Sequence, residues 1–437
     1  MYRKISKAIE DYLKTDDGRI LCVTGARQVG KTHIIKELAP RYYKNYIELN
    51  MVDDKNGPKL FQDVNTLDSF YLKVSSIAGD KMDSYDNTII FIDEIQEYEQ
   101  LLTLLKPLNI DHKYRIICSG SELGMALKKT TSIPIGSLTE IRMYPMDFEE
   151  FLLANSVGPS VIDYMRNSYL SLQPIDSSLH DKIIELFKQY LLIGGMPQAV
   201  KEYLVSKNIS KVRSIHNDII KYYSEDASKY DKAQKLKIKR IYEMITSTID
   251  SKVRRLKYSQ IDNIKGARYT GYIDEFDYLI SSGIALETKA ISEPRYPLIQ
   301  SSEKNLIKLY MNDIGLLTAK LYKNNITAVL NDMSNVNLGA VYETVTAQEL
   351  KCHGHDLYYY DNKKNGEVDY LIEDNDNLSV LPIEIKSGRD YTNYRALPKI
   401  ISNQNYPIQK GYVFNNKREV IIKDKIIHLP IYYIMFL

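Results

Sequence analysis

Tryptophan is absent from this 437-residue sequence, and cysteine occurs three times, as Cys22, Cys118 and Cys352. The cysteines are far apart and form no CxxC pair, so we expect neither a disulfide framework nor a structural zinc site. So few cysteines are typical of a protein from a reducing compartment. The 44% of hydrophobic and 26% of charged residues exclude wholesale disorder and a fibrous repeat, and the length predicts roughly two to four domains.

Long apolar runs are missing as well. No run approaches the roughly 18 residues that a membrane helix needs. The first residues, MYRKISKAIEDYLK, lack the apolar core of a signal peptide. We therefore expect a soluble, cytoplasmic protein with no membrane partner.

The net charge of +2 hides an uneven distribution. Residues 201–270 hold 17 lysines and arginines against 8 aspartates and glutamates. Such a segment predicts either an anionic partner such as DNA or a solvated basic helical face, and charge alone leaves both open. Tyrosine is dense throughout the chain, but five tyrosines in or beside this segment could stack on bases, namely Tyr222, Tyr223, Tyr258, Tyr269 and Tyr272.

Between Arg19 and Met143, short β-branched runs alternate with helical stretches, which is typical of a parallel sheet in a three-layer α/β sandwich. We assign residues 1–154 to this domain. Residues 155–232 predict a helical linker or lid region. Residues 233–325 follow the order helix, helix, strand, strand, which is typical of a winged helix, and residues 326–437 predict a separate small α/β domain.

The segment GARQVGKT fits the phosphate-binding pattern G-x-x-x-x-G-K-[ST] between an apolar strand and a helix. Its glycines let successive backbone N–H groups point at phosphate oxygens, and the helix start adds its positive dipole end. Lys31 is expected to contact the β- and γ-phosphates and Thr32 to bind Mg²⁺, with ATP as the nucleotide. The predicted cofactor-binding residues are Gly25, Ala26, Arg27, Gln28, Val29, Gly30, Lys31 and Thr32.

Two further apolar strands end in polar residues. TIIFIDE ends in Asp93, which could hold Mg²⁺ through water, and Glu94, which could activate the attacking water. RIICSGS ends in Ser119 and Ser121, either of which could contact the γ-phosphate, although serine after a strand is also ordinary turn chemistry. The pair Asp93–Glu94 therefore predicts hydrolysis of ATP as well as its binding.

The motifs GARQVGKT, FIDEIQ, ICSGS and MYPMDFEEFL together resemble the AAA-type ATPase family that joins an AAA_14 domain to a C-terminal DUF4143 domain. The resemblance implies a P-loop NTPase sandwich of the AAA+/ASCE type, a helical and winged-helix middle, and a restriction-endonuclease-like C-terminal domain. Many relatives carry Gly-Arg where this sequence has Gly136-Ser137. The arginine finger is therefore unassigned, with Arg142 and Arg115 as candidates.

A second group of charged residues lies near the C-terminus. EVDYLIE and LPIEIKSG place Asp369 on one expected strand and Glu384 and Lys386 on the next, where residues two apart share a face. With Glu343 on the preceding helix, this pattern resembles the PD-(D/E)xK nuclease core, with Asp369 and Glu384 as metal ligands. The alternative is a cross-strand ion pair on a wet face. The nearby CHGH segment, Cys352–His355, lacks a second ligand pair and predicts no metal site.

Two functions remain open from the sequence. The favoured one is an ATP-hydrolysing protein that acts on DNA or is regulated by it, with a nuclease-like C-terminal domain. The alternative is a nucleotide-gated switch or scaffold whose C-terminal domains mediate protein contacts, and a homo-oligomer is a further partner that the sequence allows. A small-molecule kinase is disfavoured, because the chain shows several extra domains and no acceptor-substrate pocket.

Overall fold

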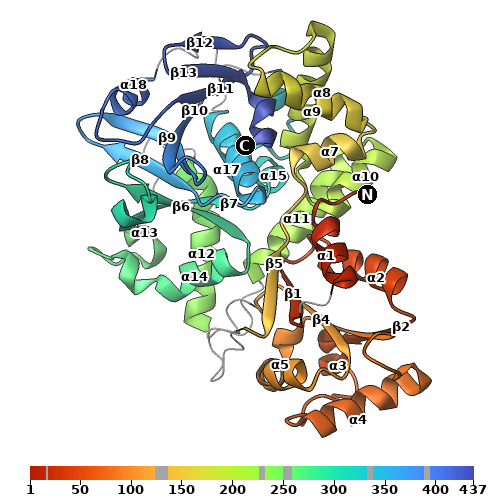
Figure 1. Ribbon diagram of the computed structural model, residues 1–437. Coiled ribbons are helices and arrows are strands. Elements are labelled where there is room, and N and C mark those ends of the chain that lie inside the picture. Colours follow the sequence, from red (N-terminus) through yellow and green to blue (C-terminus); the bar gives the residue numbers. More distant parts are fainter. Residues whose placement is uncertain (16–17, 124–135, 226–231, 250–257, 332–337, 388–393) are drawn as a thin grey trace. The chain divides into compact units, whose positions relative to one another are not determined.

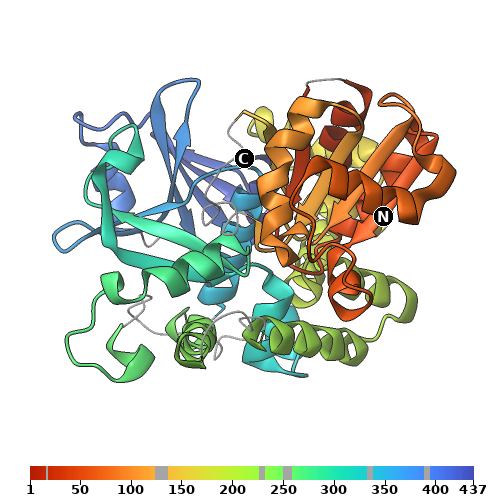
Figure 2. The same ribbon diagram turned by 90° about the horizontal axis from the view of Figure 1, so that it is seen from below.

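The computed structural model describes residues 1–15, 18–123, 136–225, 232–249, 258–331, 338–387 and 394–437 (Figures 1 and 2). The chain forms two compact units. Unit 1 comprises Met1–Tyr144 with the short segment Ser281–Gly283, and unit 2 comprises Pro145–Ile280 and Ile284–Leu437.

Unit 1 alternates strands with helices along the chain, in the order that the sequence predicted. Its described elements are α1 (Ile5–Lys14), β1 (Ile20–Thr24), α2 (Lys31–Tyr42), β2 (Asn45–Asn50), α3 (Met51–Asn56), α4 (Leu67–Ala78), η1 (Gly79–Lys81), β3 (Thr88–Asp93), η2 (Ile95–Glu97), α5 (Glu99–Asp111), β4 (Arg115–Gly120) and β5 (Leu138–Arg142).

The five strands of unit 1 form a parallel sheet in the order β2-β3-β4-β1-β5. Every residue of β1, β3 and β4 is buried, as expected for strands that helices cover on both faces. One face packs against α4 and α5, while α2 contacts β2 and β3. The predicted three-layer α/β sandwich is confirmed, and β4 separates β1 from β3, so the carboxyl ends of these three strands are neighbours.

Unit 2 begins with helices and ends with a mixed sheet. Its helices are α7 (Phe148–Ala154), α8 (Pro159–Leu170), α9 (Ser177–Ile193), α10 (Pro197–Ser206), α11 (Ile209–Glu225), α12 (Lys232–Ile249), α13 (Ser259–Asp262), η3 (Tyr269–Gly271), α14 (Ile273–Ser281), η4 (Leu298–Ser301), α15 (Ile314–Tyr322), α16 (Thr327–Leu330), α17 (Gly339–Cys352), α18 (Ala396–Ile401) and η5 (Ile431–Phe436). Its strands are β6 (Ala285–Ile291), β7 (Ser302–Met311), β8 (Tyr358–Asn362), β9 (Gly366–Asp374), β10 (Ser379–Ile385), β11 (Gly411–Asn415), β12 (Ile421–Lys423) and β13 (Ile426–Pro430).

These strands form one eight-stranded sheet in the order β12-β13-β11-β10-β9-β8-β6-β7. Strands β8, β9 and β10 are antiparallel neighbours, whereas β11 follows α18 and pairs with β10 in parallel. Helix α17 contacts β6, β7 and β10, and α18 belongs to an apolar cluster with residues of β8, β9 and β10 (Figure 1). The elements α17-β8-β9-β10-α18-β11 follow one another along the chain in the order α-β-β-β-α-β.

The unit boundaries differ from the domain boundaries expected from the sequence. Unit 1 ends at Tyr144 and not at residue 154, because α7 is bonded within unit 2: Phe148 N donates to Glu349 Oε1, 3.0 Å away, and Tyr190 Oη donates to Met146 O at 2.7 Å. The hairpin β6–β7, which the sequence assigned to a winged-helix domain ending at residue 325, pairs through β6 with β8. That hairpin and the strands after residue 326 therefore share one sheet.

None of the helices in the described part of the chain has both the length and the apolar character that crossing a bilayer takes.

Candidate active site

The loop between β1 and α2 carries the phosphate-binding motif. Its backbone turns through left-handed conformations at Gly25 (φ 134°), Gln28 (φ 65°) and Gly30 (φ 102°), which directs successive N–H groups inward. A Cβ added at Gly25 would overlap Met143 O, so this position requires glycine. Ala26 and Val29 anchor the loop in the core, with exposed fractions of 2% and 0%.

Lys31 and Thr32 open α2 beneath this loop. The Lys31 ammonium is buried and donates to Gly25 O at 2.9 Å and Ala26 O at 3.0 Å. The Thr32 hydroxyl donates to the Asp93 carboxylate, with distances of 2.9 and 3.1 Å to its two oxygens. A buried cation at the start of a helix fits a polyphosphate, and the hydroxyl–carboxylate pair of Thr32 and Asp93 fits the oxygen donors that Mg²⁺ prefers.

Asp93 ends β3 and lies between two hydroxyls, because the Ser119 hydroxyl at the end of β4 also donates to it. Burial raises the pKa of Asp93 above its ordinary value, while the hydrogen bonds from Ser119 and Thr32 and the charge of Lys31 oppose that rise. The structure thus brings Lys31, Thr32, Asp93 and Ser119 together at the carboxyl ends of β1, β3 and β4.

Glu94 adopts a left-handed backbone conformation (φ 51°) directly after β3. Its Oε2 accepts hydrogen bonds from Gln96 Nε2 at 2.6 Å, Ser121 Oγ at 3.2 Å and Ser121 N at 3.3 Å. Burial works to raise the pKa of Glu94, but the charge of Lys31 and the hydrogen bond from Gln96 outweigh it, so that the pKa is lowered. Glu94 is therefore held as a carboxylate beside the phosphate loop.

The arginines Arg27, Arg142 and Arg115 of unit 1 have different surroundings. Arg27 Nε donates to Ser121 Oγ at 3.2 Å, and its guanidinium lies 3.8 Å from Glu122 Oε1. Arg142 ends β5, where it pairs in register with Thr24, so it stays a candidate for contact with phosphate. Arg115 starts β4, at the other end of this strand from Ser119. It is 2% exposed, and its guanidinium donates to Tyr12 O and Thr15 O at 2.6 and 2.7 Å, so it is not placed to act as an arginine finger.

The second group of predicted residues lies in unit 2. Asp369 on β9 accepts a hydrogen bond from Ile385 N at 2.8 Å through its Oδ2, and the Lys386 ammonium lies 3.2 Å from Glu384 Oε2. Burial raises the pKa of Glu384 well above its ordinary value, and the charge of Asp369, to which Glu384 is hydrogen-bonded, raises it further. The structure therefore brings Asp369, Glu384 and Lys386 together.

Glu343 is buried on α17 and does not join them in a three-carboxylate group. Its Oε2 accepts a hydrogen bond from Tyr310 Oη at 3.3 Å, and its backbone oxygen accepts one from Tyr370 Oη at 2.8 Å. Among the residues that the structure describes, no three histidine, cysteine, aspartate or glutamate side chains are arranged to hold a metal ion. Two carboxylates still fit Mg²⁺, which usually keeps several waters and completes its shell with substrate phosphate.

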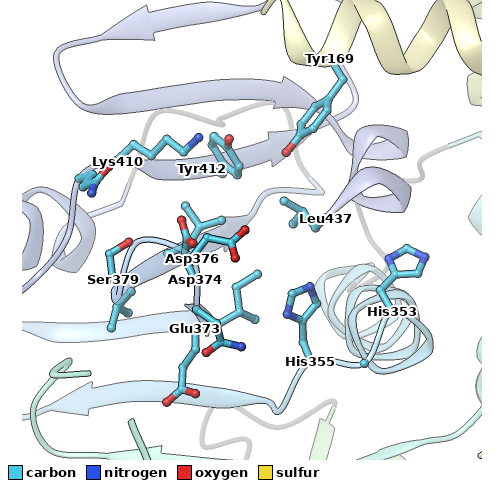
Figure 3. A pocket seen from close by; sticks show the side chains of 16 residues that line it. Tyr169, His353, His355, Glu373, Asp374, Asp376, Ser379, Lys410, Tyr412 and Leu437 are labelled. Atoms are coloured by element: carbon cyan, nitrogen blue, oxygen red, sulfur yellow. The ribbon is translucent and has the colours of Figure 1, made fainter. Parts of the chain in front are cut away.

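A pocket of about 450 Å³ lies elsewhere in unit 2 (Figure 3). Residues of β9, β10 and β11 line it together with the turn after α17, and none of the predicted site residues is among them. Figure 3 shows its labelled polar side chains, including His353, His355, Asp374, Asp376 and Lys410. The CHGH histidines therefore line this pocket, which shares no residue with the two predicted sites.

Sequence reasoning missed several residues that contact the candidate sites. Gln96 donates to Glu94, and its place in FIDEIQ was a signal that could have been used. Arg3, near the start of the chain, donates from its guanidinium to Val29 O of the phosphate loop at 2.9 Å, and no sequence pattern indicates that contact.

The basic residues Arg254, Arg255 and Lys257 of segment 201–270 lie outside the described residues.

Three family models match the chain. Residues 17–152 match AAA_14, described as an AAA domain, residues 184–327 match the domain of unknown function DUF8612, and residues 338–434 match the domain of unknown function DUF4143. An uncharacterized protein of Haemophilus influenzae is 25% identical over 209 residues. That match covers 45% of this chain and 46% of the relative, so the chain spans under half of the relative's length.

Similar solved structures include the Walker-type ATPase PABY2304 of Pyrococcus abyssi, with 16% identity and a TM-score of 0.44 over 72% of this chain and 94% of that one. The ORC2 protein of Aeropyrum pernix, in its ADPNP and ADP complexes, has 14% identity and a TM-score of 0.37 over 76% of this chain and 95% of that one. The ORC1 protein of the same organism, in complex with DNA, has 11% identity and a TM-score of 0.29 over 75% and 92%.

Proposed function

We propose that this chain binds ATP with Mg²⁺ and hydrolyses it. As the sequence predicted, it combines a match to the AAA_14 domain with a match to a C-terminal DUF4143 domain. The observation that carries the proposal is the meeting of Lys31, Thr32, Asp93 and Ser119 at the ends of three neighbouring parallel strands. Ligands of open α/β sheets bind at this edge.

Each residue of this group would act on a different part of the bound nucleotide. The loop N–H groups and the Lys31 ammonium would hold the β- and γ-phosphates, and Thr32 and Asp93 would hold Mg²⁺. The metal would neutralise charge that develops on the phosphates. Glu94, kept ionised by its neighbours, would orient the attacking water and accept its proton, and Ser119 would contact the γ-phosphate.

Two substitutions test binding and hydrolysis separately. Lys31→Ala removes a contact to ground-state phosphates and should abolish ATP binding measured by calorimetry. Glu94→Gln should bind ATP with Mg²⁺ but hydrolyse it at least about 100-fold more slowly, because general base catalysis supplies about that factor. Lys36→Ala is a matched control, since this lysine of α2 is half-exposed and pairs with Glu48. Wild-type turnover by Glu94→Gln would contradict the role of Glu94.

We also propose that the C-terminal carboxylates hold Mg²⁺ or Mn²⁺ and act on a nucleic-acid phosphodiester. Asp369 and Glu384 would hold the metal, and Lys386 would stabilise charge that develops on the phosphate. The proximity of these three side chains on β9 and β10 supports this activity. Segment 201–270, with its excess of basic residues, would supply contacts to the DNA backbone.

Cleavage and binding of DNA distinguish this proposal from a switch or scaffold. Plasmid or single-stranded DNA should be cut with Mn²⁺ present, and Asp369→Ala should abolish the cutting while the exposed Asp376→Ala leaves it unchanged. DNA affinity measured with and without ATP should depend on the nucleotide and fall steeply with salt. Absence of both cleavage and DNA binding would favour a nucleotide-gated protein scaffold.

A further inference from the structure

Strand β7 brings two buried polar side chains to the C-terminal carboxylates from outside the α-β-β-β-α-β core. Tyr310 Oη donates to Glu343 Oε2 at 3.3 Å, and the Lys308 ammonium donates to the carboxylate of Glu367 on β9. Glu367 precedes Asp369 by two residues on the same strand. The hairpin β6–β7 thus contacts Glu343 and, through Glu367, the strand that carries Asp369, although nothing in its sequence pattern assigned it there.

Lys308 is a charged group with almost no access to water. Its side chain is 3% exposed, and its ammonium lies 4.4 Å from the centre of the Tyr359 ring. Burial works to lower the pKa of Lys308, but the electrostatic influence of Tyr310 and the charges of Glu367 and Asp369 outweigh it and raise the pKa. A buried ammonium persists only where negative charge compensates it, so Lys308 and the carboxylates of β9 stabilise one another.

Two lysines lie close to carboxylates of β9 and β10. Lys386 contacts Glu384 on β10, and Lys308 reaches Glu367 and acts electrostatically on Asp369 on β9. Carboxylates this close repel one another unless a cation lies nearby. Lys386 is 22% exposed and can meet a substrate, whereas Lys308 is too deeply buried to touch a phosphate and can act only through its neighbours.

We propose that Lys308 is a positioning residue, a built-in counter-cation for the carboxylates of β9 that opposes the binding of a divalent cation at Asp369 and Glu384. The inference rests on the proposed metal site at Asp369 and Glu384. Because Lys308 and a bound divalent cation would both be positive and would lie beside neighbouring carboxylates of β9, Glu367 and Asp369, loading the metal must overcome their repulsion. The site would then fill only when substrate phosphate adds further negative charge.

Calorimetric titration of the nucleotide-free full chain with Mn²⁺ tests this inference. The binding heat that the wild type shows and Asp369→Asn lacks is the heat of Mn²⁺ binding at this site. Lys308→Met removes the charge and keeps the stem, and should bind Mn²⁺ at this site about tenfold more tightly than the wild type. Lys289→Met on β6 is the matched control, because that lysine pairs with Glu287 at 3.4 Å, is 39% exposed and should leave the affinity unchanged.

A second pair of variants gives the same comparison if Lys308→Met does not fold. Glu367→Gln alone leaves Lys308 charged, whereas Glu367→Gln with Lys308→Met leaves no unpaired charge in the interior. The double variant should bind Mn²⁺ about tenfold more tightly than the single one. Equal or weaker binding on loss of Lys308, with Asp369-dependent heat present, would overturn the counter-cation alone. Absence of Asp369-dependent heat in every protein would overturn the proposed metal site as well.

Discussion

Gly120 at the end of β4 controls how Gln96 holds Glu94. An alanine Cβ at this position would overlap Gln96 Oε1 and lie 3.0 Å from the Leu123 Cβ. The backbone of Gly120 lies in a strand and can accommodate alanine, so the side chain of Gln96 must move. We therefore expect Gly120→Ala to fold normally and to break the hydrogen bond of 2.6 Å from Gln96 Nε2 to Glu94 Oε2.

The loss of that hydrogen bond should raise the pKa of Glu94 by an amount that can be worked out. The bond favours the charged form of Glu94 and so lowers its pKa, and without it the protonated form gains. A hydrogen bond to a charged group contributes about 1.5–3 kcal/mol, which shifts the protonation equilibrium of Glu94 by about tenfold or more. Because the ionised form would activate water, ATP hydrolysis at acidic pH should fall by about that factor while the rate at alkaline pH is retained.

The assay is the steady-state rate of ATP hydrolysis between about pH 5 and pH 9 at saturating ATP. In Gly120→Ala the acidic limb of the profile should move to higher pH, and Gln96→Leu should reproduce the movement. Gly271→Ala is the matched control, because an added Cβ there meets nothing within 4 Å. An unchanged acidic limb in Gly120→Ala, with ATP binding intact, would refute the argument that Gln96 sets the charge of Glu94.

Two further predictions concern other buried polar groups. Thr32→Val removes the hydroxyl that donates to Asp93. It should reduce by about tenfold the gain in ATP affinity that Mg²⁺ gives, while the affinity without metal stays unchanged. Nucleotide titrations with and without Mg²⁺ measure both affinities. Burial raises the pKa of Asp313 from 3.8 to about 6, despite hydrogen bonds from Gly195 N and Leu316 N. The folded protein therefore binds this proton more tightly than the unfolded chain, which contributes up to roughly 3 kcal/mol to the free energy of unfolding. This contribution is full below about pH 4 and is lost as the pH rises through 6. Urea unfolding of the wild type and Asp313→Asn between pH 4 and 7 measures it, and a difference that does not vary with pH would count against it.

The grouping of residues at the proposed nucleotide site could be predicted from the sequence because its determinants are local. GARQVGKT and FIDEIQ each lie within one strand and the turn after it, and the apolar strands before them place both turns at the same edge of a parallel sheet. The exclusion of Arg115 as an arginine finger could not be predicted from the residues around it. It depends on which end of β4 the residue occupies and on Tyr12 and Thr15, about 100 positions earlier in the chain.

In unit 2 the sequence by itself determined that Glu384 and Lys386 share a face, because side chains two apart on a strand point the same way. That Asp369 lies beside them depends on the antiparallel pairing of β9 with β10. Tertiary structure alone decided that β6 and β7 extend the same sheet and that Lys308 lies against Glu367. The physical reason is that strand order depends on packing between segments far apart in the chain, and a helix-helix-strand-strand pattern fits a winged helix and a sheet extension equally well. Burial of Lys308 follows from that packing, since a lysine is buried only where the fold surrounds it with compensating charge.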